Sequence, residues 1–265
     1  MPNSEKIENA AQTLAGQFRS NQLHLLAPDQ LPDDLDEAYL VQRAYQMEMS
    51  KEQGDIVGYK LAYTTPVLQK ANGVDEPAMG IMLANNIRQS PSTLSAGDFV
   101  QLGIECEVAA RLGSDLPASG APYDREKVSE AVESLMTAFE VIDSRRTPGQ
   151  EQRTQFISAV AGNISNAGVV LGDPVTDWRG IDLPAAYGSM TINGEVVGDG
   201  HGSDVMGHPL EPLAWLANKL AEQGLGLTAG MVIITGSIVS PKFLKAGDNC
   251  SIMIEGLGGA ELNVV

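Results

Sequence analysis

Apolar residues recur at helical spacing near the start of the chain. Residues 4–18 and residues 36–52 each place apolar side chains three or four positions apart, which predicts two amphipathic helices. Between them, Pro28, Pro32 and several aspartates indicate a loop. We therefore expect residues 1–55 to form a small helical N-terminal portion. It either stands apart or packs onto the remainder as one continuous domain.

From about residue 56 the pattern changes to short apolar runs that are separated by glycine-rich turns. These runs predict strands at residues 56–61, 99–112, 139–142, 168–171, 189–192, 195–197, 231–235 and 251–254. Asn193-Gly194 lies between two of them and predicts a type I′ hairpin. Two further helices are expected, one over residues 125–137 and one from His208-Pro209 to near Gly224.

The order of these elements is not the strict alternation of strand and helix that a doubly wound sheet requires. Strands predominate after residue 56, and the two later helices interrupt them. The sequence therefore predicts an α+β fold. It consists of a mixed β-roll or barrel over residues 56–265 with helices packed outside, preceded by the helical portion.

Three glutamates lie in the predicted strands. Glu105 and Glu107 are one residue apart, so they point to the same face, because side chains alternate along a strand. Glu140 lies in a second predicted strand. Two like charges held this close repel one another unless a cation lies between them. A solvated polar face explains the pair about as well as a metal site does, and the pattern leaves both readings open.

A metal site of this kind would have a defined chemistry. Three carboxylates form an all-oxygen set, which suits Mg²⁺ or Mn²⁺. They over-neutralise a divalent ion, so a neighbouring cation is expected. Lys60 lies within an apolar strand-like run and is the natural candidate. It is either a snorkelling residue at an edge or a buried cation whose pKa is lowered or clamped by carboxylates.

Composition limits the possible partners and compartments. With 17 basic and 34 acidic residues, the net charge is −17, which argues against a nucleic-acid partner. Cys106 and Cys250 are too few for a disulfide framework and are expected to be small core residues in a reducing compartment. The polar start of the chain is unlike a secretory signal, and no apolar run is long enough for a bilayer. We expect a cytoplasmic protein without a membrane partner.

An ordered series of motifs extends over nearly the whole chain and is more specific than any one of them. It includes Gly58-Tyr59-Lys60, Ile104-Glu105-Cys106-Glu107, Phe139-Glu140-Val141-Ile142-Asp143-Ser144-Arg145 and Ile234-Thr235-Gly236-Ser237. This series resembles the 2-keto-4-pentenoate hydratase and 4-oxalocrotonate decarboxylase family of the fumarylacetoacetate hydrolase superfamily.

The resemblance implies a divalent cation held by Glu105, Glu107 and Glu140, with Lys60 as the active-site lysine. It also implies small 2-oxo or 2-hydroxydienoate acids from aromatic-compound degradation as substrates, and assembly as a homo-oligomer. Asn163 and Ser165 are candidate substrate contacts, although turn chemistry explains them adequately. Ser237, in the last of the resembling motifs, is a further candidate.

Two positions depart from the family pattern. Ala78 stands where the hydratases have an aspartate, and Gly162 stands where an acidic residue is usual. Hydration of a 2-hydroxypenta-2,4-dienoate remains the first expectation, and Ala78 makes decarboxylation of 4-oxalocrotonate the nearest alternative. A non-catalytic partner or ligand-binding subunit on the same fold is the third. The family's hydratases and decarboxylases can form complexes with one another, so a sister enzyme is a possible partner.

Overall fold

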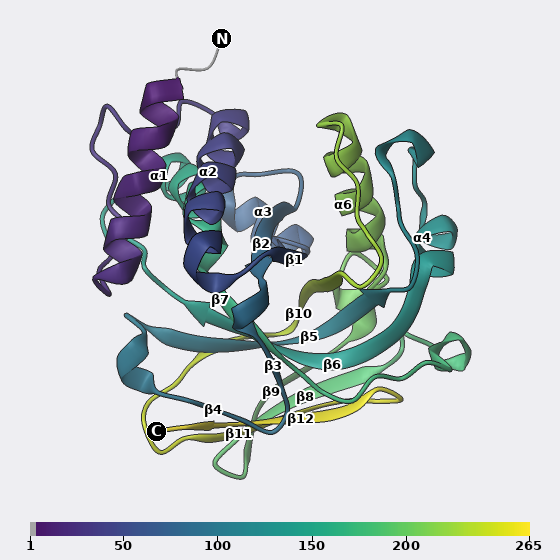
Figure 1. The fold of residues 1–265 in the computed structure, drawn as a ribbon. Coiled ribbons are helices and arrows are strands. Elements are labelled where there is room, and N and C mark those ends of the chain that lie inside the picture. The colour runs from purple at the N-terminus through teal and green to yellow at the C-terminus, as the bar shows by residue number, and fades with distance from the viewer. Residues whose placement is uncertain (1–3) are drawn as a thin grey trace.

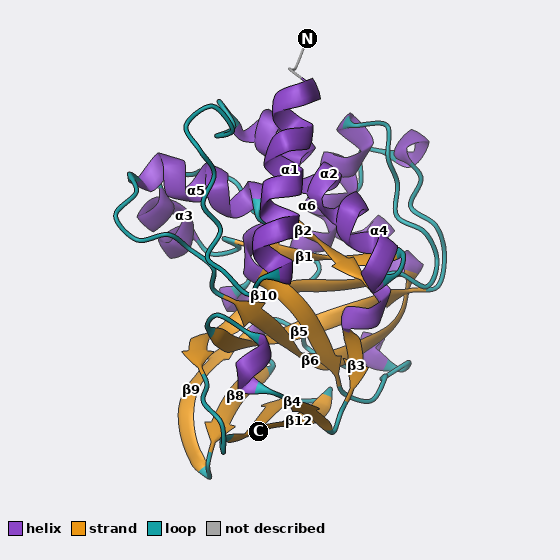
Figure 2. Ribbon diagram, turned by 60° about the vertical axis from the view of Figure 1, so that its left-hand side comes forward, coloured by secondary structure: helices purple, strands orange, loops and turns teal. Residues whose placement is uncertain are grey.

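The chain, described for residues 4–265 by a computed structural model, has two β-sheets in layers with the helices gathered on one side (Figure 1). The helices lie above the larger sheet, and the smaller sheet lies below it, as the turned view also shows (Figure 2). The α-helices are α1 (Ser4–Arg19), α2 (Leu35–Gln53), α3 (Pro66–Asn72), α4 (Arg125–Ala131), α5 (Gln152–Ala161) and α6 (Glu211–Glu222).

The larger sheet is mixed and has the strand order β2-β1-β10-β5-β6-β7-β3. Its strands are β1 (Ile56–Ala62), β2 (Ala78–Leu83), β3 (Ile87–Gln89), β5 (Leu102–Leu112), β6 (Val132–Asp143), β7 (Asn166–Leu171) and β10 (Val232–Phe243). β1 runs parallel to β10, and β3 runs parallel to β7, whereas the other neighbours are antiparallel. Strands adjacent in space are therefore often distant in sequence.

The smaller sheet has the strand order β4-β12-β11-β8-β9. Its strands are β4 (Ser92–Leu94), β8 (Tyr187–Ile192), β9 (Glu195–His201), β11 (Asn249–Ile254) and β12 (Gly258–Val264). Asn193 and Gly194 connect β8 to β9, and both have positive φ, of 53° and 85°. A type I′ turn requires this conformation at both central residues, so the predicted hairpin is confirmed.

The two N-terminal helices form where the apolar spacing predicts them. Asp34 caps α2 by accepting a hydrogen bond from the backbone N–H of Glu37. Within α2, the buried Gln42 donates from Nε2 to the carbonyls of Met79 in β2 and Val160 in α5. The helix is thereby tied to the sheet. The division at residue 55 stays a prediction, and residues 1–3 of the proposed portion lie outside the described residues.

The helix predicted over residues 125–137 is wrong in its second half. α4 ends at Ala131, and the chain continues directly as the long strand β6 from Val132. β6 is buried along nearly its whole length, so its apolar residues show no alternation that would distinguish a strand from a helix. Pairing with β5, from Leu112 to Leu102, decides the conformation. Local periodicity could not report that long-range pairing.

The glutamate face of the larger sheet carries its own small apolar core. Ala109 lies two residues beyond Glu107 on the same face, and Ala138 lies two residues before Glu140. Both belong to one buried cluster, whose members are Met82, Ala109, Met136, Ala138, Val169, Leu171, Val232 and Ile234. The cluster fills one part of this face and leaves the glutamates at its border. The predicted α+β roll with N-terminal helices is confirmed by this architecture.

None of the helices described in residues 4–265 combines the length and apolar character needed to cross a membrane.

Candidate metal centre

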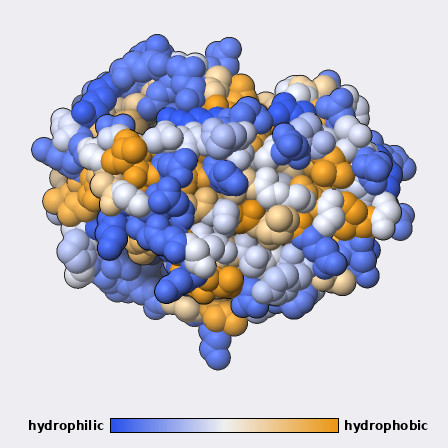
Figure 3. All heavy atoms as spheres, turned by 90° about the horizontal axis from the view of Figure 1, so that it is seen from below, coloured by the Kyte–Doolittle hydropathy of each residue, from blue (hydrophilic) through white to orange (hydrophobic). Residues whose placement is uncertain are grey.

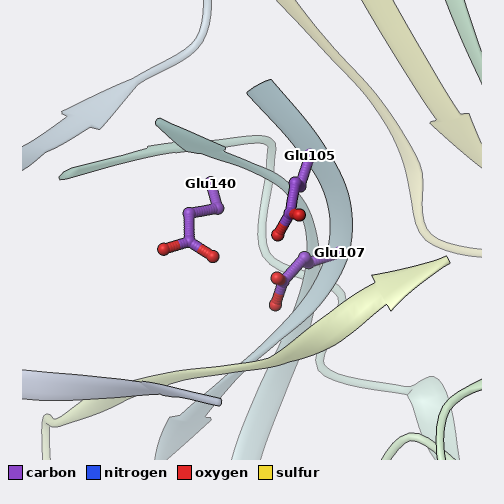
Figure 4. Close-up of side chains that lie close together, drawn as sticks. All are labelled: Glu105, Glu107 and Glu140. Carbon is purple, nitrogen blue, oxygen red and sulfur yellow. The ribbon is translucent and has the colours of Figure 1, made fainter. Parts of the chain in front are cut away.

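Glu105, Glu107 and Glu140 converge in space (Figure 4). Glu105 on β5 is directly opposite Glu140 on β6 in the antiparallel register, and Glu107 projects from the same face of β5. One carboxylate oxygen from each residue lies within 4.8 Å of those of the other two. The open question from the sequence is thus answered in part: these side chains do not form a solvated face.

The carboxylates are held in an environment that opposes their charge. Glu107 and Glu140 are fully buried, and Glu105 is partly buried. Burial, followed by the charge of Glu140, raises the pKa of Glu105 to about 8. Burial and both neighbouring carboxylates raise the pKa of Glu107 well above its usual range. Three such groups must either retain protons or share a cation.

The donor set fits a hard divalent ion. All three groups offer oxygen, and Oε1 of Glu107 is buried without a hydrogen-bond partner among residues 4–265. An unpaired buried carboxylate oxygen costs free energy, and a metal ligand has that lone pair available. The residues present therefore fit Mg²⁺ or Mn²⁺.

Backbone and amide groups orient two of the carboxylates. The N–H of Gly236 donates to Oε2 of Glu107 at 2.7 Å. Gly236 has a φ of 118°, and a Cβ there would collide with the side chain of Thr64, so glycine is required. Asn166 donates from Nδ2 to Oε1 of Glu140 at 2.9 Å. Partners of this kind fix ligand orientation in metal sites.

Lys60 on β1 is a buried cation rather than a snorkelling residue. Its Nζ lies 3.1 Å and 3.3 Å from the two carboxylate oxygens of Glu140, and the residue is 3 % exposed. Burial alone lowers the pKa of Lys60, but the nearby glutamates, Glu140 foremost, outweigh it and raise that pKa. A Cβ on Gly80 of β2 would lie 3.0 Å from Cγ of Lys60, so glycine leaves room for the stem.

A cavity of about 280 Å³ opens onto this cluster. Lys60 and Glu105 contribute to its wall, together with Arg146 and the predicted substrate residues Ser165 and Ser237. Asn163 is not in the wall. Its side-chain amide instead pairs with the backbone of Ile81, accepting at 2.7 Å and donating at 2.9 Å. Both polar atoms of its side chain are thus engaged by the backbone, and its predicted contact with the substrate stays a prediction.

The segment that carries Ser165 is strained. Asn163, Ile164 and Ser165 have φ values of 65°, 49° and 61°, in the left-handed region. This conformation is unfavourable for a β-branched residue such as Ile164, and strain of this kind gathers at functional sites. The segment places Ser165 in the cavity wall and brings the next residue, Asn166, to Glu140.

The two positions that depart from the family pattern have different surroundings. Ala78 begins β2, is fully buried and pairs with Ala62, a residue of the cavity wall. At Gly162, a Cβ would lie 2.8 Å from Nδ1 of His24, so the histidine ring takes up the space next to this glycine. Burial, with a smaller effect of Arg145, lowers the pKa of His24 to about 4, which keeps its ring neutral.

Sequence reasoning did not single out Arg146 or Tyr63 as site residues. It considered Asn166 only as part of a polar patch that could bind a substrate carboxylate, and not as a partner of Glu140. The signal for Asn166 was its place in a polar patch just before an apolar run. Arg146 follows directly after the last residue of a resembling motif, and Tyr63 directly follows the strand that carries Lys60. Only the tertiary structure brings these three side chains to the glutamates or their cavity.

Comparison with known proteins adds an independent line of evidence. The family model for the fumarylacetoacetate (FAA) hydrolase C-terminal region matches residues 55–265. The chain is 32 % identical over 262 residues to 2-hydroxyhexa-2,4-dienoate hydratase of Comamonas testosteroni, covering 97 % of each chain. It is also 32 % identical over 257 residues to 2-keto-4-pentenoate hydratase of Burkholderia vietnamiensis, covering 95 % of this chain and 96 % of the relative.

A solved structure is similar over the whole chain. It is 4-oxalocrotonate decarboxylase from Pseudomonas putida G7, complexed with magnesium and adipate. The TM-score is 0.91 and the identity 27 %, with 100 % of this chain and 99 % of that chain covered.

Proposed function

Because the chain belongs to the fumarylacetoacetate hydrolase family, we propose that it is a divalent-metal-dependent lyase acting on a small enolisable 2-oxo acid. The observation that carries this proposal is the convergence of Glu105, Glu107 and Glu140 beside the buried cation Lys60. A purely structural role does not account for four charged groups brought together at the border of a cavity.

Glu105, Glu107 and Glu140 would hold Mg²⁺ or Mn²⁺. When bound, such an ion supplies stabilisation of negative charge on substrate oxygen atoms. The magnesium complex of the similar decarboxylase supports this assignment. The partners of Glu107 and Glu140, which are Gly236 and Asn166, would keep the two carboxylates aimed at one point.

Lys60 would act as the catalytic residue. Its raised pKa keeps the ammonium protonated while the glutamates are charged. From the cavity wall, its Nζ can donate a hydrogen bond to a substrate oxygen and place positive charge beside a developing enolate. Ser165 and Ser237 would add hydroxyl contacts that orient the substrate.

Hydration of a 2-hydroxydienoate, of the 2-hydroxypenta-2,4-dienoate type found in aromatic-compound catabolism, is the first candidate reaction. The two hydratases at 32 % identity support it. Decarboxylation of a substrate such as 4-oxalocrotonate is the second candidate. The observation in its favour is Ala78, which provides no carboxyl group to orient water at the start of β2. The similar decarboxylase structure supports the same candidate.

One assay separates these candidates. Purified protein with Mg²⁺ or Mn²⁺ is given a panel of 2-hydroxydienoates and 4-oxalocrotonate, and loss of dienol absorbance is recorded together with carbon dioxide release. Turnover without carbon dioxide supports the hydratase, and turnover with it supports the decarboxylase. Metal binding without turnover of any substrate would refute the proposed lyase activity and favour a ligand-binding or partner subunit.

We further propose a cytoplasmic homo-oligomer that can associate with a sister hydratase or decarboxylase. The two cysteines are free and buried, as expected in a reducing compartment. Apolar and polar side chains are interspersed on the lower face of the molecule (Figure 3), and Val196 of β9 and Met253 of β11 are exposed. Light scattering of the purified protein tests the assembly, and a monomer at micromolar concentration would refute it.

A further inference from the structure

Tyr63 occupies an unusual position in the wall of the cavity beside the glutamates. It follows β1 directly, three residues after Lys60, and both residues line this cavity. The residue is 7 % exposed, and its φ of 57° lies in the left-handed region. That conformation is unfavourable for a bulky aromatic residue, and it persists only where the surrounding structure enforces it. The fold therefore places this ring in the wall against a local backbone preference.

Three contacts fix the position of Tyr63. Its ring packs edge-on against Phe156, with 5.2 Å between the ring centroids. Its backbone carbonyl accepts a hydrogen bond from Nε2 of Gln69 at 2.9 Å. Its phenol oxygen accepts one from Nη2 of Arg146 at 3.4 Å. The ring, the backbone and the phenol oxygen are each held, so the hydroxyl has a defined place in the wall.

The proton of this hydroxyl is available to a bound molecule. In the part of the chain that the structure describes, the phenol oxygen accepts from Arg146, and its O–H donates to no other group. A phenol is also a stronger acid than the hydroxyl of serine or threonine. Among the described residues of the wall, Tyr63 is the one phenol, and Glu105 of the metal cluster is the one carboxyl group.

The other polar groups near this cavity are directed elsewhere or carry no acid. Nζ of Lys60 lies 3.1 Å and 3.3 Å from the two carboxylate oxygens of Glu140, which engage two of its hydrogens. The guanidinium of Arg146 does not give up a proton in a protein. Ala78 and Gly162, where the family pattern has carboxyl groups, have no side chain that could donate one. Tyr63 is therefore the proton donor that remains.

Hydration of a 2-hydroxydienoate has a step that requires such a donor. The carbon at the far end of the diene must gain a proton, and the enol becomes a ketone before water adds to the remaining double bond. In the proposed function, the 2-oxo acid end of the substrate lies at the glutamates and Lys60. The carbon that gains the proton then lies away from them, along the wall of the cavity.

We propose that Tyr63 donates this proton. The inference rests on the proposed function, with hydration as its reaction. The phenol O–H bond breaks, and a C–H bond forms with the electron pair of the terminal C=C bond. The enol hydroxyl becomes the carbonyl and releases its proton to water, from which the phenolate recovers one. Until then, the guanidinium of Arg146 stabilises the phenolate through the hydrogen bond to its oxygen.

Tyr63→Phe removes the hydroxyl and keeps the ring. The Mn²⁺-loaded protein is given 2-hydroxypenta-2,4-dienoate, and loss of dienol absorbance measures the step directly. We expect kcat to fall about 10²–10⁴-fold while KM and Mn²⁺ affinity stay unchanged. Tyr39→Phe is the control and should keep the full kcat. Tyr39 is also 7 % exposed, its hydroxyl accepts from the backbone N–H of Met79 at 3.2 Å, and it lines a different cavity.

Chemical rescue separates a chemical role of Tyr63 from a structural one. Glycine adopts positive φ readily, so Tyr63→Gly is compatible with the backbone and removes the whole side chain. Phenol added to this variant should restore part of the lost kcat, because it returns the acidic hydroxyl to the space left by the ring. Benzene has the same ring without the hydroxyl and should restore none.

Three results would overturn the inference alone. They are an undiminished kcat in Tyr63→Phe, equal rescue of Tyr63→Gly by phenol and benzene, and turnover of 4-oxalocrotonate without any turnover of the dienoate. The last result counts because decarboxylation can end at the dienol and then needs no proton at carbon. Failure of the Mn²⁺-loaded protein to act on either substrate would refute the proposed function and this inference with it.

Discussion

Replacing Glu105 by glutamine should stabilise the metal-free protein and destabilise the metal-bound one. Glutamine has the same shape and can donate a hydrogen bond to Glu140, as a protonated glutamate would. It removes one of three converging carboxylates. The folded-state pKa of Glu105 is raised from 4.5 to about 8, so the folded protein holds an extra proton between these values. Its stability therefore falls as the pH rises through this window.

The magnitude follows from the size of the shift. At pH 7 the solution is about 2.5 pH units above the ordinary pKa of 4.5, at which the glutamate of the unfolded chain loses its proton. This interval corresponds to ~3 kcal/mol of lost stability. Glu105 lies in the cavity wall and is only partly buried, and it shares its proton with two neighbours, so solvent and coupling reduce this figure. We expect Glu105→Gln to gain about 1–2 kcal/mol, or roughly 2–8 °C in Tm, in EDTA at pH 7. At pH 5 the gain should nearly vanish.

Mn²⁺ should make the unaltered protein more stable than Glu105→Gln, the reverse of the order in EDTA. At a free concentration 100 times Kd, Mn²⁺ stabilises the unaltered protein by about 2.7 kcal/mol. Glu105→Gln lacks one ligand and should gain far less at the same concentration. Thermal melts at pH 5 and pH 7, with EDTA or with Mn²⁺, measure all four cases.

Glu133→Gln provides the control, because Glu133 is an exposed residue of β6, the strand that carries Glu140. It should leave every melt unchanged. The reasoning is wrong if Glu105→Gln melts below the unaltered protein in EDTA at both pH values, or if Mn²⁺ stabilises both proteins equally.

Three further substitutions test other parts of the site. Lys60→Met should lower kcat by about 10²–10⁴-fold while Mn²⁺ binding persists, because the cation beside the substrate is lost; an unchanged kcat in the dienol assay would exclude Lys60 from the chemistry. Ala78→Asp should shift turnover towards water addition, measured as a lower ratio of carbon dioxide released to dienol consumed. An unchanged ratio would show that Ala78 does not favour decarboxylation. Gly162→Ala should cost about 1–3 kcal/mol in urea unfolding, because its Cβ would lie 2.8 Å from Nδ1 of His24 and 3.3 Å from the carbonyl of Ser158. Adding His24→Ala should recover much of that loss, so strictly additive effects would contradict the proposed contact.

Local patterns in the sequence determined a large part of the fold. The N-terminal helices were predicted because apolar spacing at 3.6 residues is a property of neighbouring residues. The hairpin at Asn193-Gly194 was predicted for the same kind of reason, since both residues readily adopt positive φ. The shared face of Glu105 and Glu107 also follows from backbone alternation alone. Glu140 and Lys60 were candidates because each lies in its own strand-like run, and the resemblance of the motifs then assigned them to the same site as that pair, which no local rule does.

Only the tertiary structure decided how these pieces meet. Residues 132–137 became strand because β6 pairs with β5, and the same register sets Glu140 opposite Glu105. Lys60 reaches Glu140 across 80 positions of sequence. Asn163 was a candidate substrate contact, and the fold pairs its amide with the backbone of Ile81, whereas Arg146, which was not a candidate, lies in the cavity wall. Helical and strand periodicities are set by adjacent residues, whereas strand register and the burial of charge depend on contacts between distant ones.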